Sequence, residues 1–248
     1  MEQEQFEMLI DKFIASRESK ERQLGKYYAS ELGMCPRKLT FSYKYPRQMD
    51  KPTLRIMQVG EIFHDWIAKM LGASAVHGVK LLANERSITL ISPNSEAVIS
   101  GRLDDLIVVD RTGEQVVVDV KTIKSFDYLE KPKKEHILQV MMYLKALSIK
   151  KGGLLYIKKD DMQIKYFEFE YDPKVVADLI SRADTVHKAL TEGTYPSKVE
   201  MADRWQCRYC SYSLECAEAD KKNVNPFEEK LNNTEDEKER DEIQWLKK

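Results

Sequence analysis

Two short stretches carry side chains that could do chemistry together. In "VVVDVKTIKSF", residues 116–126, an otherwise apolar run contains Asp119 and Lys121. Side chains alternate between the two faces of a β-strand, so Asp119 and Lys121 are expected on one face. The earlier stretch "GRLDDL" supplies two further carboxylates, Asp104 and Asp105. A hairpin between the two stretches would place one of these carboxylates beside Asp119.

Carboxylates from two neighbouring strands repel one another unless a proton or a cation neutralises them. Mg²⁺ and Mn²⁺ accept oxygen ligands, and a lysine beside such an ion can orient a water or stabilise a developing negative charge. These are the parts needed to hydrolyse a phosphodiester. Two other readings stay open, namely a hairpin with surface charges and a structural ion pair between Asp119 and Lys121 at a strand end.

Two expected helices add polar side chains to the candidate set. On the helix of residues 58–72, His64 lies beside an apolar stripe. Gln139 and Tyr143 are four residues apart and therefore lie on one face of the helix of residues 134–150. An amide and a tyrosine there could contact a phosphate or stack on a base. The alternative is a packed histidine and a polar edge beside a core stripe.

The four cysteines form a pattern of one plus three. Cys35 stands alone, and "CRYCSYSLEC" holds Cys207, Cys210 and Cys216. Intracellular chains rarely use cysteines as disulfides, whereas a C-x-x-C pair with a nearby third thiol suits a metal or a cluster. Zinc more often uses two paired knuckles, so the spacing favours a [4Fe–4S] cluster over zinc or thiols without a ligand.

The elements that must position these residues alternate between helices and strands. Helices are expected within residues 3–29, from near Pro36, and over 58–72, 134–150 and 173–192. The stripe of the 58–72 helix is expected to be Ile62, Trp66, Ile67 and Leu71. Strands are expected at "RSITLIS", "EAVISGRLDDLIVVD", "EQVVVDVKT", "GGLLYIKK" and "QIKYFEFEY". The predicted fold class is α/β, a mixed sheet flanked by helices.

Length and composition fit a soluble globular protein of one large domain, or of one domain plus a small appendage, and we expect no membrane anchor. The chain has 248 residues, of which 42% are hydrophobic and 33% charged. With 40 basic and 41 acidic residues, the charge balance neither indicates nor excludes a polyanionic partner. No apolar run approaches the roughly 18 residues of a membrane span, and the acidic N-terminus does not resemble a signal peptide. We therefore expect a cytoplasmic protein, or one in the host cytoplasm if it is viral.

The order "GEIFH", "GRLD", "VVDVK", "QVMMY" resembles the RecB-like branch of the PD-(D/E)XK nuclease superfamily, which has a restriction-endonuclease-like fold. The resemblance covers residues 60–143. It implies that Asp104 is used rather than Asp105, and Glu85 is a weaker candidate for the same site. The roles it implies are metal ligation by His64, Asp104, Asp119 and the carbonyl of Val120, catalysis by Asp104, Asp119 and Lys121, and substrate contact by Gln139 and Tyr143.

With the cysteines included, the chain resembles the iron–sulfur RecB-like nucleases. These include the fourth family of CRISPR-associated proteins and the nuclease domain of AddB. The resemblance implies a [4Fe–4S] cluster on Cys35, Cys207, Cys210 and Cys216 that ties the N-terminal helical part to the C-terminal segment. We expect one nuclease domain over 1–216, with its core at about 58–192 and cluster-binding parts at 30–45 and 203–216. A charged tail, helical or disordered, is expected over 217–248.

The expected function is therefore a Mg²⁺- or Mn²⁺-dependent exonuclease that acts on single-stranded DNA ends, from 5′ to 3′. CRISPR spacer acquisition, beside the CRISPR integrase complex, and viral DNA processing both remain open as its cellular role. The rival hypotheses are a DNA-binding adaptor that keeps the fold without catalysis and an iron–sulfur redox protein. The preferred metal and the oligomeric state do not follow from the sequence.

Overall fold

The computed structural model describes residues 3–16, 22–47, 49–73, 78–196 and 205–222. The chain divides into two compact units, Met1–Pro196 and Ser197–Lys248. The helices of the first unit are α1 (Gln3–Ala15), α2 (Pro36–Lys44), α3 (Lys51–Gly72), α4 (Lys134–Leu147) and α5 (Pro173–Thr191). Its strands are β1 (Lys26–Tyr28), β2 (Val79–Asn84), β3 (Ser87–Ile91), β4 (Val98–Arg102), β5 (Asp105–Val109), β6 (Glu114–Ile123), β7 (Lys151–Lys158) and β8 (Ile164–Glu170).

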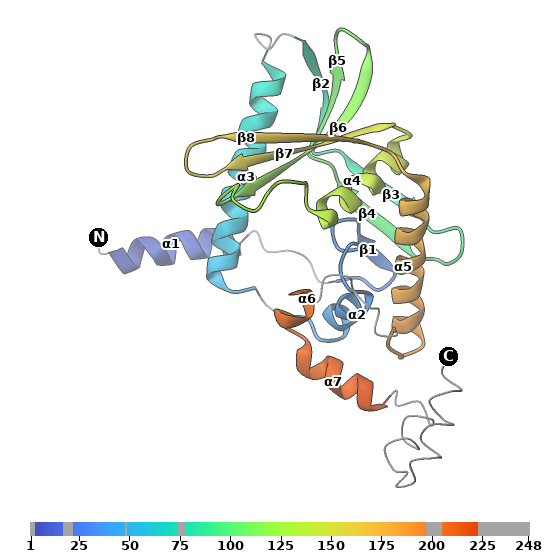
Figure 1. Ribbon diagram of the computed structural model, residues 1–248. Coiled ribbons are helices and arrows are strands. Elements are labelled where there is room, and N and C mark those ends of the chain that lie inside the picture. Colours follow the sequence, from blue (N-terminus) through green and yellow to red (C-terminus); the bar gives the residue numbers. More distant parts are fainter. Residues whose placement is uncertain (1–2, 17–21, 48, 74–77, 197–204, 223–248) are drawn as a thin grey trace. The chain divides into compact units, whose positions relative to one another are not determined.

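The strands of the first unit form two sheets (Figure 1). The order of the larger sheet is β2-β5-β6-β7-β8, and that of the smaller is β1-β4-β3. In the larger sheet β6 and β7 run parallel, while its other neighbouring strands are antiparallel. Parallel neighbours need a crossover connection, and α4 lies in that connection. The predicted α/β class and the mixed sheet are confirmed.

The side chains of β6 point alternately toward two layers of helices. Val118 and Val120 belong to apolar clusters that include α3 side chains, whereas Val117 belongs to the large core shared with α4. Figure 1 shows α3 along one side of the larger sheet and α4 on the other. Asp119 and Lys121, at the same parity as Val117, therefore lie on the α4 side, as the alternation predicted.

The run predicted as one strand, "EAVISGRLDDLIVVD", is two strands in two sheets, so that prediction was wrong. β4 ends at Arg102 and pairs with β1 and β3, and β5 begins at Asp105 and pairs with β2 and β6. Leu103, between them, is fully buried, and its backbone N–H donates to the carbonyl of Arg86. Asp104 consequently occupies the junction between the sheets rather than the middle of a strand.

The helix expected over 58–72 begins earlier, at Lys51. Asp50 caps it, since its carboxylate accepts a hydrogen bond from the backbone N–H of Thr53 at 3.0 Å. The predicted apolar stripe was partly wrong, because Ile62 and Trp66 are 59% and 47% exposed. Contact with the sheet is made instead by a narrower stripe: Phe63, Ile67, Met70 and Leu71.

Two strands have no counterpart in the sequence prediction. β1 has three residues and lies within the region expected to be helical, and β2 has six residues. A strand of three residues is too short to show an alternation, and β2 has no fully buried residue and only one β-branched side chain to mark it as a strand. The helix predicted from Pro36 is confirmed as α2, and the other predicted helices agree with α1, α4 and α5 to within a few residues, except that α1 ends at Ala15.

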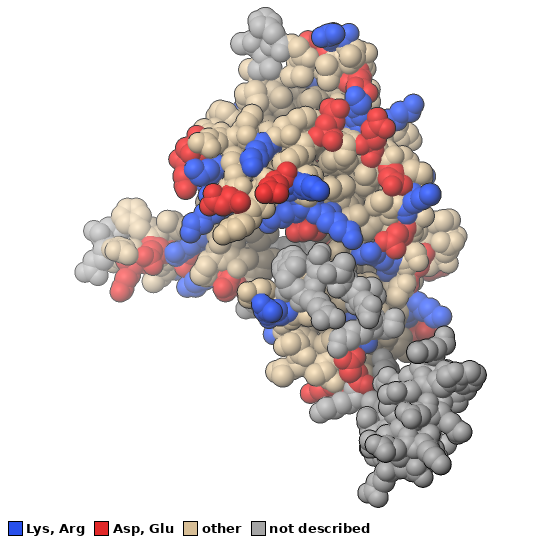
Figure 2. Space-filling view, in the orientation of Figure 1, with Lys and Arg blue, Asp and Glu red and all other residues tan. Residues whose placement is uncertain are grey.

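Acidic and basic side chains are interspersed over the face drawn in Figure 2, in keeping with the near-neutral composition. Across the described ranges, no helix is both long and apolar enough to cross a membrane.

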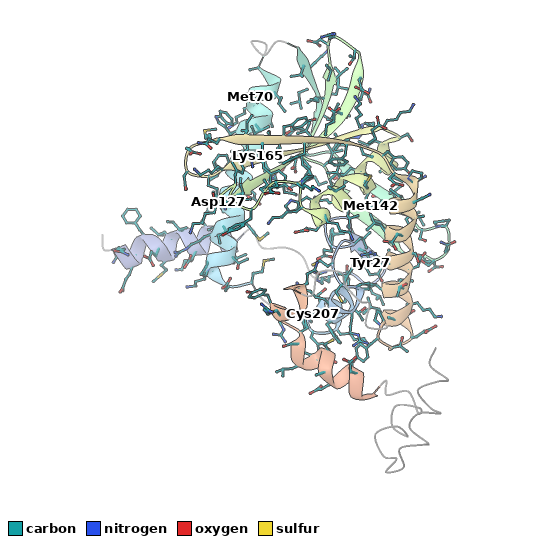
Figure 3. The ribbon with its side chains drawn as sticks, in the orientation of Figure 1. Tyr27, Met70, Asp127, Met142, Lys165 and Cys207 are labelled. Atoms are coloured by element: carbon teal, nitrogen blue, oxygen red, sulfur yellow. The ribbon has the colours of Figure 1, made fainter. Side chains whose placement is uncertain are left out.

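The main core lies between α4, α5 and the sheets. Met142 of α4 and Tyr27 of β1 are fully buried in it (Figure 3). Gly101 of β4 allows a close approach here, because a Cβ atom at this position would lie 2.6 Å from Cε1 of Tyr143. The lack of a side chain at residue 101 therefore lets the ring of Tyr143 pack against β4.

The second unit contains the helices α6 (Trp205–Arg208) and α7 (Ser213–Lys222). Cys207 lies in α6, and its carbonyl accepts a hydrogen bond from the N–H of Cys210 at 3.2 Å, while Cys216 lies in α7. In the first unit, Cys35 directly precedes α2. Most of the predicted charged tail, from residue 223 onward, lies outside the described residues.

Candidate active site

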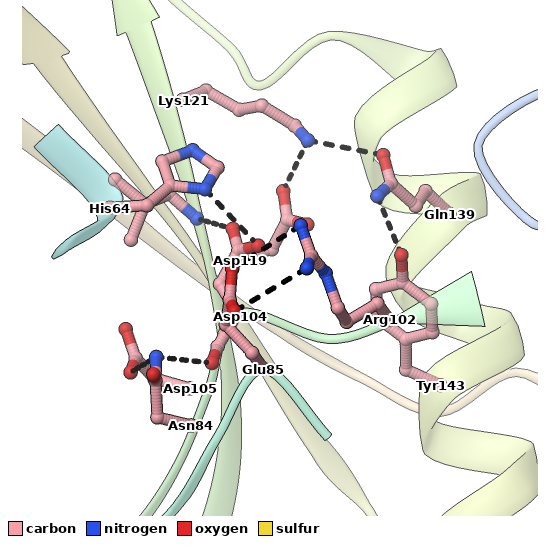
Figure 4. A network of polar contacts seen from close by, with 11 residues as sticks. His64, Asn84, Glu85, Arg102, Asp104, Asp105, Asp119, Lys121, Gln139 and Tyr143 are labelled. Atoms are coloured by element: carbon pink, nitrogen blue, oxygen red, sulfur yellow. Dashed lines mark hydrogen bonds and ion pairs between the residues drawn. The ribbon is translucent and has the colours of Figure 1, made fainter. Parts of the chain in front are cut away.

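The register of the β5–β6 hairpin brings Asp104 and Asp119 together. Asp105 pairs with Val118, so the next step along both segments places Asp104 opposite Asp119. The backbone N–H of Val120 donates to Oδ2 of Asp104 at 2.7 Å, which holds the carboxylate against β6 (Figure 4). The two aspartates thus face one another from adjacent segments, as the sequence led us to expect.

Asp119 is a fully buried carboxylate beside one lysine. Nζ of Lys121 lies 2.8 Å from Oδ2 of Asp119, and both side chains come from the same face of β6. Neither oxygen of Asp119 has a partner with hydrogen-bond geometry among the described residues. Burial raises the pKa of Asp119, the charge of Lys121 opposes this shift, and the charge of Asp104 adds to it. Such a carboxylate is a strong ligand for a cation.

His64 reaches Asp104 from α3. Its Nδ1 lies 3.4 Å from Oδ1 of Asp104. Burial lowers the pKa of His64, but the hydrogen bond to Asp104 and the charge of that carboxylate outweigh burial, so the net shift is upward. The structure therefore places the predicted helical histidine next to the carboxylates.

Lys121 is held from α4 by a short chain of side chains. Its Nζ donates to Oε1 of Gln139 at 3.1 Å, and Nε2 of Gln139 donates to the hydroxyl of Tyr143 at 2.7 Å. Tyr143 is only 2% exposed, and burial raises the pKa of its hydroxyl. Its ring is packed in the core and its hydroxyl contacts Gln139, and substrate contact by Tyr143 stays a prediction.

Asp105 and Glu85 are engaged away from this cluster. Oδ1 of Asp105 accepts from Nδ2 of Asn84 at 3.1 Å, and burial raises the pKa of Asp105 to about 6. Glu85 forms an ion pair with Arg102 at 3.2 Å. The choice of Asp104 over Asp105 and the lower rank of Glu85 stay predictions. Asn84, which also donates to the carbonyl of Asp104, was not predicted, because a single amide at a strand end carries no recognisable spacing.

The donor types fit a small divalent cation. Two carboxylates, an imidazole and a backbone carbonyl are ligands that Mg²⁺ and Mn²⁺ accept, and among the described residues the oxygens of Asp119 have the ion pair with Lys121 but no contact with hydrogen-bond geometry. In the described part of the chain, no three His, Cys, Asp or Glu side chains stand close enough together to hold an ion as they are. Lys121 lies against Asp119 and the Val120 N–H against Asp104, so the protein's own donors neutralise these oxygens in this arrangement.

The sequence and the fold of the chain resemble those of known proteins. The chain is 26% identical over 223 residues to the CRISPR-associated exonuclease Cas4 of Saccharolobus solfataricus, covering 85% of this chain and 96% of that protein. Its fold resembles the crystal structure of SSO0001, with a TM-score of 0.60 at 20% identity over 88% of this chain and 98% of that one. It also resembles an alkaline exonuclease from Laribacter hongkongensis, with a TM-score of 0.50 at 17% identity, covering 74% and 93% of the two chains.

The profile of the PD-(D/E)XK nuclease superfamily matches residues 71–217, which is more than half of the sequence. The match includes both aspartates, the lysine and the α4 residues of the site described above. The chain therefore belongs to the PD-(D/E)XK nuclease superfamily and is a deoxyribonuclease of the hydrolase class.

Proposed function

We propose that this nuclease is an exonuclease that shortens single-stranded DNA from its 5′ end, with Mg²⁺ or Mn²⁺ held by His64, Asp104, Asp119 and the carbonyl of Val120. Nucleases of this superfamily generally use divalent metal ions. One observation carries the proposal. Asp119 is fully buried and faces Asp104 from the neighbouring chain segment, and among the described residues its oxygens have the ion pair with Lys121 but no contact with hydrogen-bond geometry.

The chain's own residues have distinct roles in this proposal. A divalent ion bound here would lower the pKa of a water and polarise the scissile phosphate. Lys121 projects from the same strand face as Asp119, where its ammonium orients the attacking water and stabilises negative charge on the phosphate. Gln139 holds that ammonium at 3.1 Å, and Tyr143 fixes the amide of Gln139. Lys121 must release Asp119 when the ion binds, and its hydrogen bond to Gln139 then remains.

The exonuclease mode is supported by the curated relative, which is a CRISPR-associated exonuclease matched over 96% of its length. Strand preference, 5′-to-3′ polarity and a role in CRISPR spacer acquisition beside the integrase complex are parts of the proposal that follow the family resemblance. A [4Fe–4S] cluster on Cys35, Cys207, Cys210 and Cys216 belongs to it as well. The C-x-x-C turn at Cys207 and Cys210 supports a bound metal or cluster.

A nuclease assay with defined DNA ends tests the function. The substrates are 5′- and 3′-labelled linear single strands, a circular single strand and a duplex, each with Mn²⁺, Mg²⁺ or EDTA. We expect linear single strands to be shortened from the 5′ end with a metal ion, the circle to survive, and EDTA to stop the reaction.

Single-residue variants test the assignment of the site in that assay. Asp119→Ala and Lys121→Ala are expected to abolish cleavage, whereas Asp105→Asn, which alters a buried carboxylate outside the cluster, should still cut. Cleavage by both alanine variants at the wild-type rate would contradict the site. A wild-type chain that binds DNA without cutting it in any of these metals would instead identify a binding adaptor.

A further inference from the structure

The connection between β6 and α4, residues 124–133, borders the candidate site at both ends. It begins three residues after Lys121 and leads into the helix that carries Gln139. Figure 4 shows this connection running past Lys121 toward that helix. Tyr128, near its middle, is 99% exposed, the highest exposure among the large hydrophobic side chains of the described residues.

A tight turn fixes the backbone on both sides of Tyr128. The N–H of Leu129 donates to the carbonyl of Phe126 at 3.0 Å, and the N–H of Asp127 donates to Oγ of Ser125 at 3.1 Å. Leu129 is 2% exposed and anchors the turn in the core. Tyr128 therefore occupies the third position of a hydrogen-bonded turn, which directs its side chain outward.

Contacts from the larger sheet hold this connection at two more points. Nζ of Lys165, on β8, donates to the carbonyl of Leu129 at 2.9 Å and lies 5.2 Å from the ring centre of Phe126. Figure 3 labels Lys165 together with Asp127 of the turn. Nearer α4, the N–H of Lys133 donates to the hydroxyl of Tyr156 at 3.0 Å. The exposed ring is thus carried by an ordered support, which lowers the entropy lost when a ligand stacks on it.

The same connection carries an excess of positive charge. Its exposed basic side chains, including the first residue of α4, are Lys124, Lys131, Lys133 and Lys134, and its exposed acidic ones are Asp127 and Glu130. The face drawn in Figure 2 includes basic side chains beside acidic ones in this region. Lysines that flank an exposed aromatic ring are the combination that binds a single strand, with the ammonium groups on phosphates and the ring under a base.

We propose that Tyr128 is a stacking platform for one base of a single strand whose phosphates lie along the lysines of residues 124–134. The inference rests on the nuclease function proposed above and assigns a substrate-binding residue to the same site. A π-face is common to all four bases, so the platform binds without sequence preference. The turn holds Tyr128 on the connection between the strand of Lys121 and the helix of Gln139, where a stacked base would keep the strand in place for cleavage.

Equilibrium binding in EDTA isolates this contact from catalysis. The probe is a fluorescein-labelled oligothymidine measured by anisotropy. Loss of one stacked base is expected to raise the Kd about tenfold in Tyr128→Ala. Tyr128→Phe keeps the ring and should bind as the wild type does. Phe6→Ala removes another exposed aromatic ring, 54% exposed on α1, and should leave the Kd unchanged.

An abasic oligonucleotide of the same length distinguishes stacking from a general effect. It keeps the phosphates but has no base to stack, so wild type and Tyr128→Ala should bind it equally. Lys133→Gln should weaken binding of the thymidine and abasic strands by a similar factor, because it acts on phosphate.

Three results would overturn the inference. They are a Tyr128→Ala variant that binds oligothymidine as tightly as the wild type, an equal loss on the abasic strand, and a wild-type chain that binds no oligothymidine. The two proposals fail separately. A chain that binds through Tyr128 but never cuts contradicts only the nuclease mechanism, and a chain that cuts normally without this contact contradicts only the platform.

Discussion

Replacing Asp119 with asparagine should stabilise the protein and abolish its response to metal. The carboxylate is fully buried, and its pKa is raised above the usual value, chiefly by burial. At pH 7.5 it is charged at little cost in the unfolded chain and at greater cost in the folded one, so the charge reduces the free energy of unfolding. The neutral asparagine side chain removes that cost, and its amide can donate to Asp104.

The expected gain in the free energy of unfolding is about 1 kcal/mol. Removing the buried charge stabilises the folded chain, and the loss of the ion pair with Lys121, which keeps its bond to Gln139, offsets part of that gain. For a domain of this size, about 1 kcal/mol corresponds to a rise of roughly 2–4 °C in Tm. Mn²⁺ at 100 times its Kd stabilises the wild type by about 2.7 kcal/mol, or roughly 5–10 °C. The variant should show the first rise in EDTA and lose most of the second.

Thermal unfolding, followed by circular dichroism in EDTA and in Mn²⁺, measures both shifts. The matched control is Asp105→Asn, since Asp105 is equally buried and one of its oxygens also lacks a hydrogen-bond partner among the described residues. It should keep the Mn²⁺ shift. The reasoning is refuted if Asp119→Asn keeps the full Mn²⁺ shift, or if Asp105→Asn loses it while Asp119→Asn does not.

Three further predictions test the surroundings of the site. Gly101→Ala forces the buried ring of Tyr143 away from β4, so unfolding should be easier by about 1–3 kcal/mol in denaturant titrations and cleavage slower; an unchanged midpoint would contradict the packing. Burial lowers the pKa of His136 to about 3, so below pH 6.5 the unfolded chain binds the proton first. Stability should therefore fall by up to about 2 kcal/mol between pH 8 and pH 5, and His136→Gln should remove this part of the slope; parallel pH profiles would contradict it. Cys207→Ser should abolish the visible absorbance at about 400 nm and lower the soluble yield. A colourless wild type that contains zinc would contradict the cluster.

The sequence predicted which of these side chains meet better than it predicted the scaffold, because their contacts follow from local parity and spacing. The alternation in β6 places Asp119 beside Lys121, and the i, i+4 spacing in α4 places Gln139 beside Tyr143. Both relations follow once the strand and the helix form, and they do not depend on the tertiary structure. The meeting of Asp104 with Asp119 needed only the hairpin between β5 and β6, which the turn residues around Gly113 indicate.

Features set by distant contacts could not be predicted in the same way. The run "EAVISGRLDDLIVVD" has polar residues in its middle, but its division into β4 and β5 depends on pairing with strands of two different sheets elsewhere in the sequence. The exposure of Ile62 and Trp66 depends on how much of α3 the larger sheet covers. The burial of Tyr143 depends on Gly101, 42 positions earlier in the sequence. Tyr128 has no motif, and only its exposure on a braced turn distinguishes it.

The most direct test is the position of a bound Mn²⁺ ion, located by anomalous diffraction from a crystal of the wild-type protein soaked in Mn²⁺. The account predicts one peak within bonding distance of carboxylate oxygens from both Asp104 and Asp119, with His64 beside it and Lys121 released from Asp119 while still bonded to Gln139. A crystal in which Mn²⁺ binds elsewhere, while Lys121 stays paired with Asp119, would contradict it.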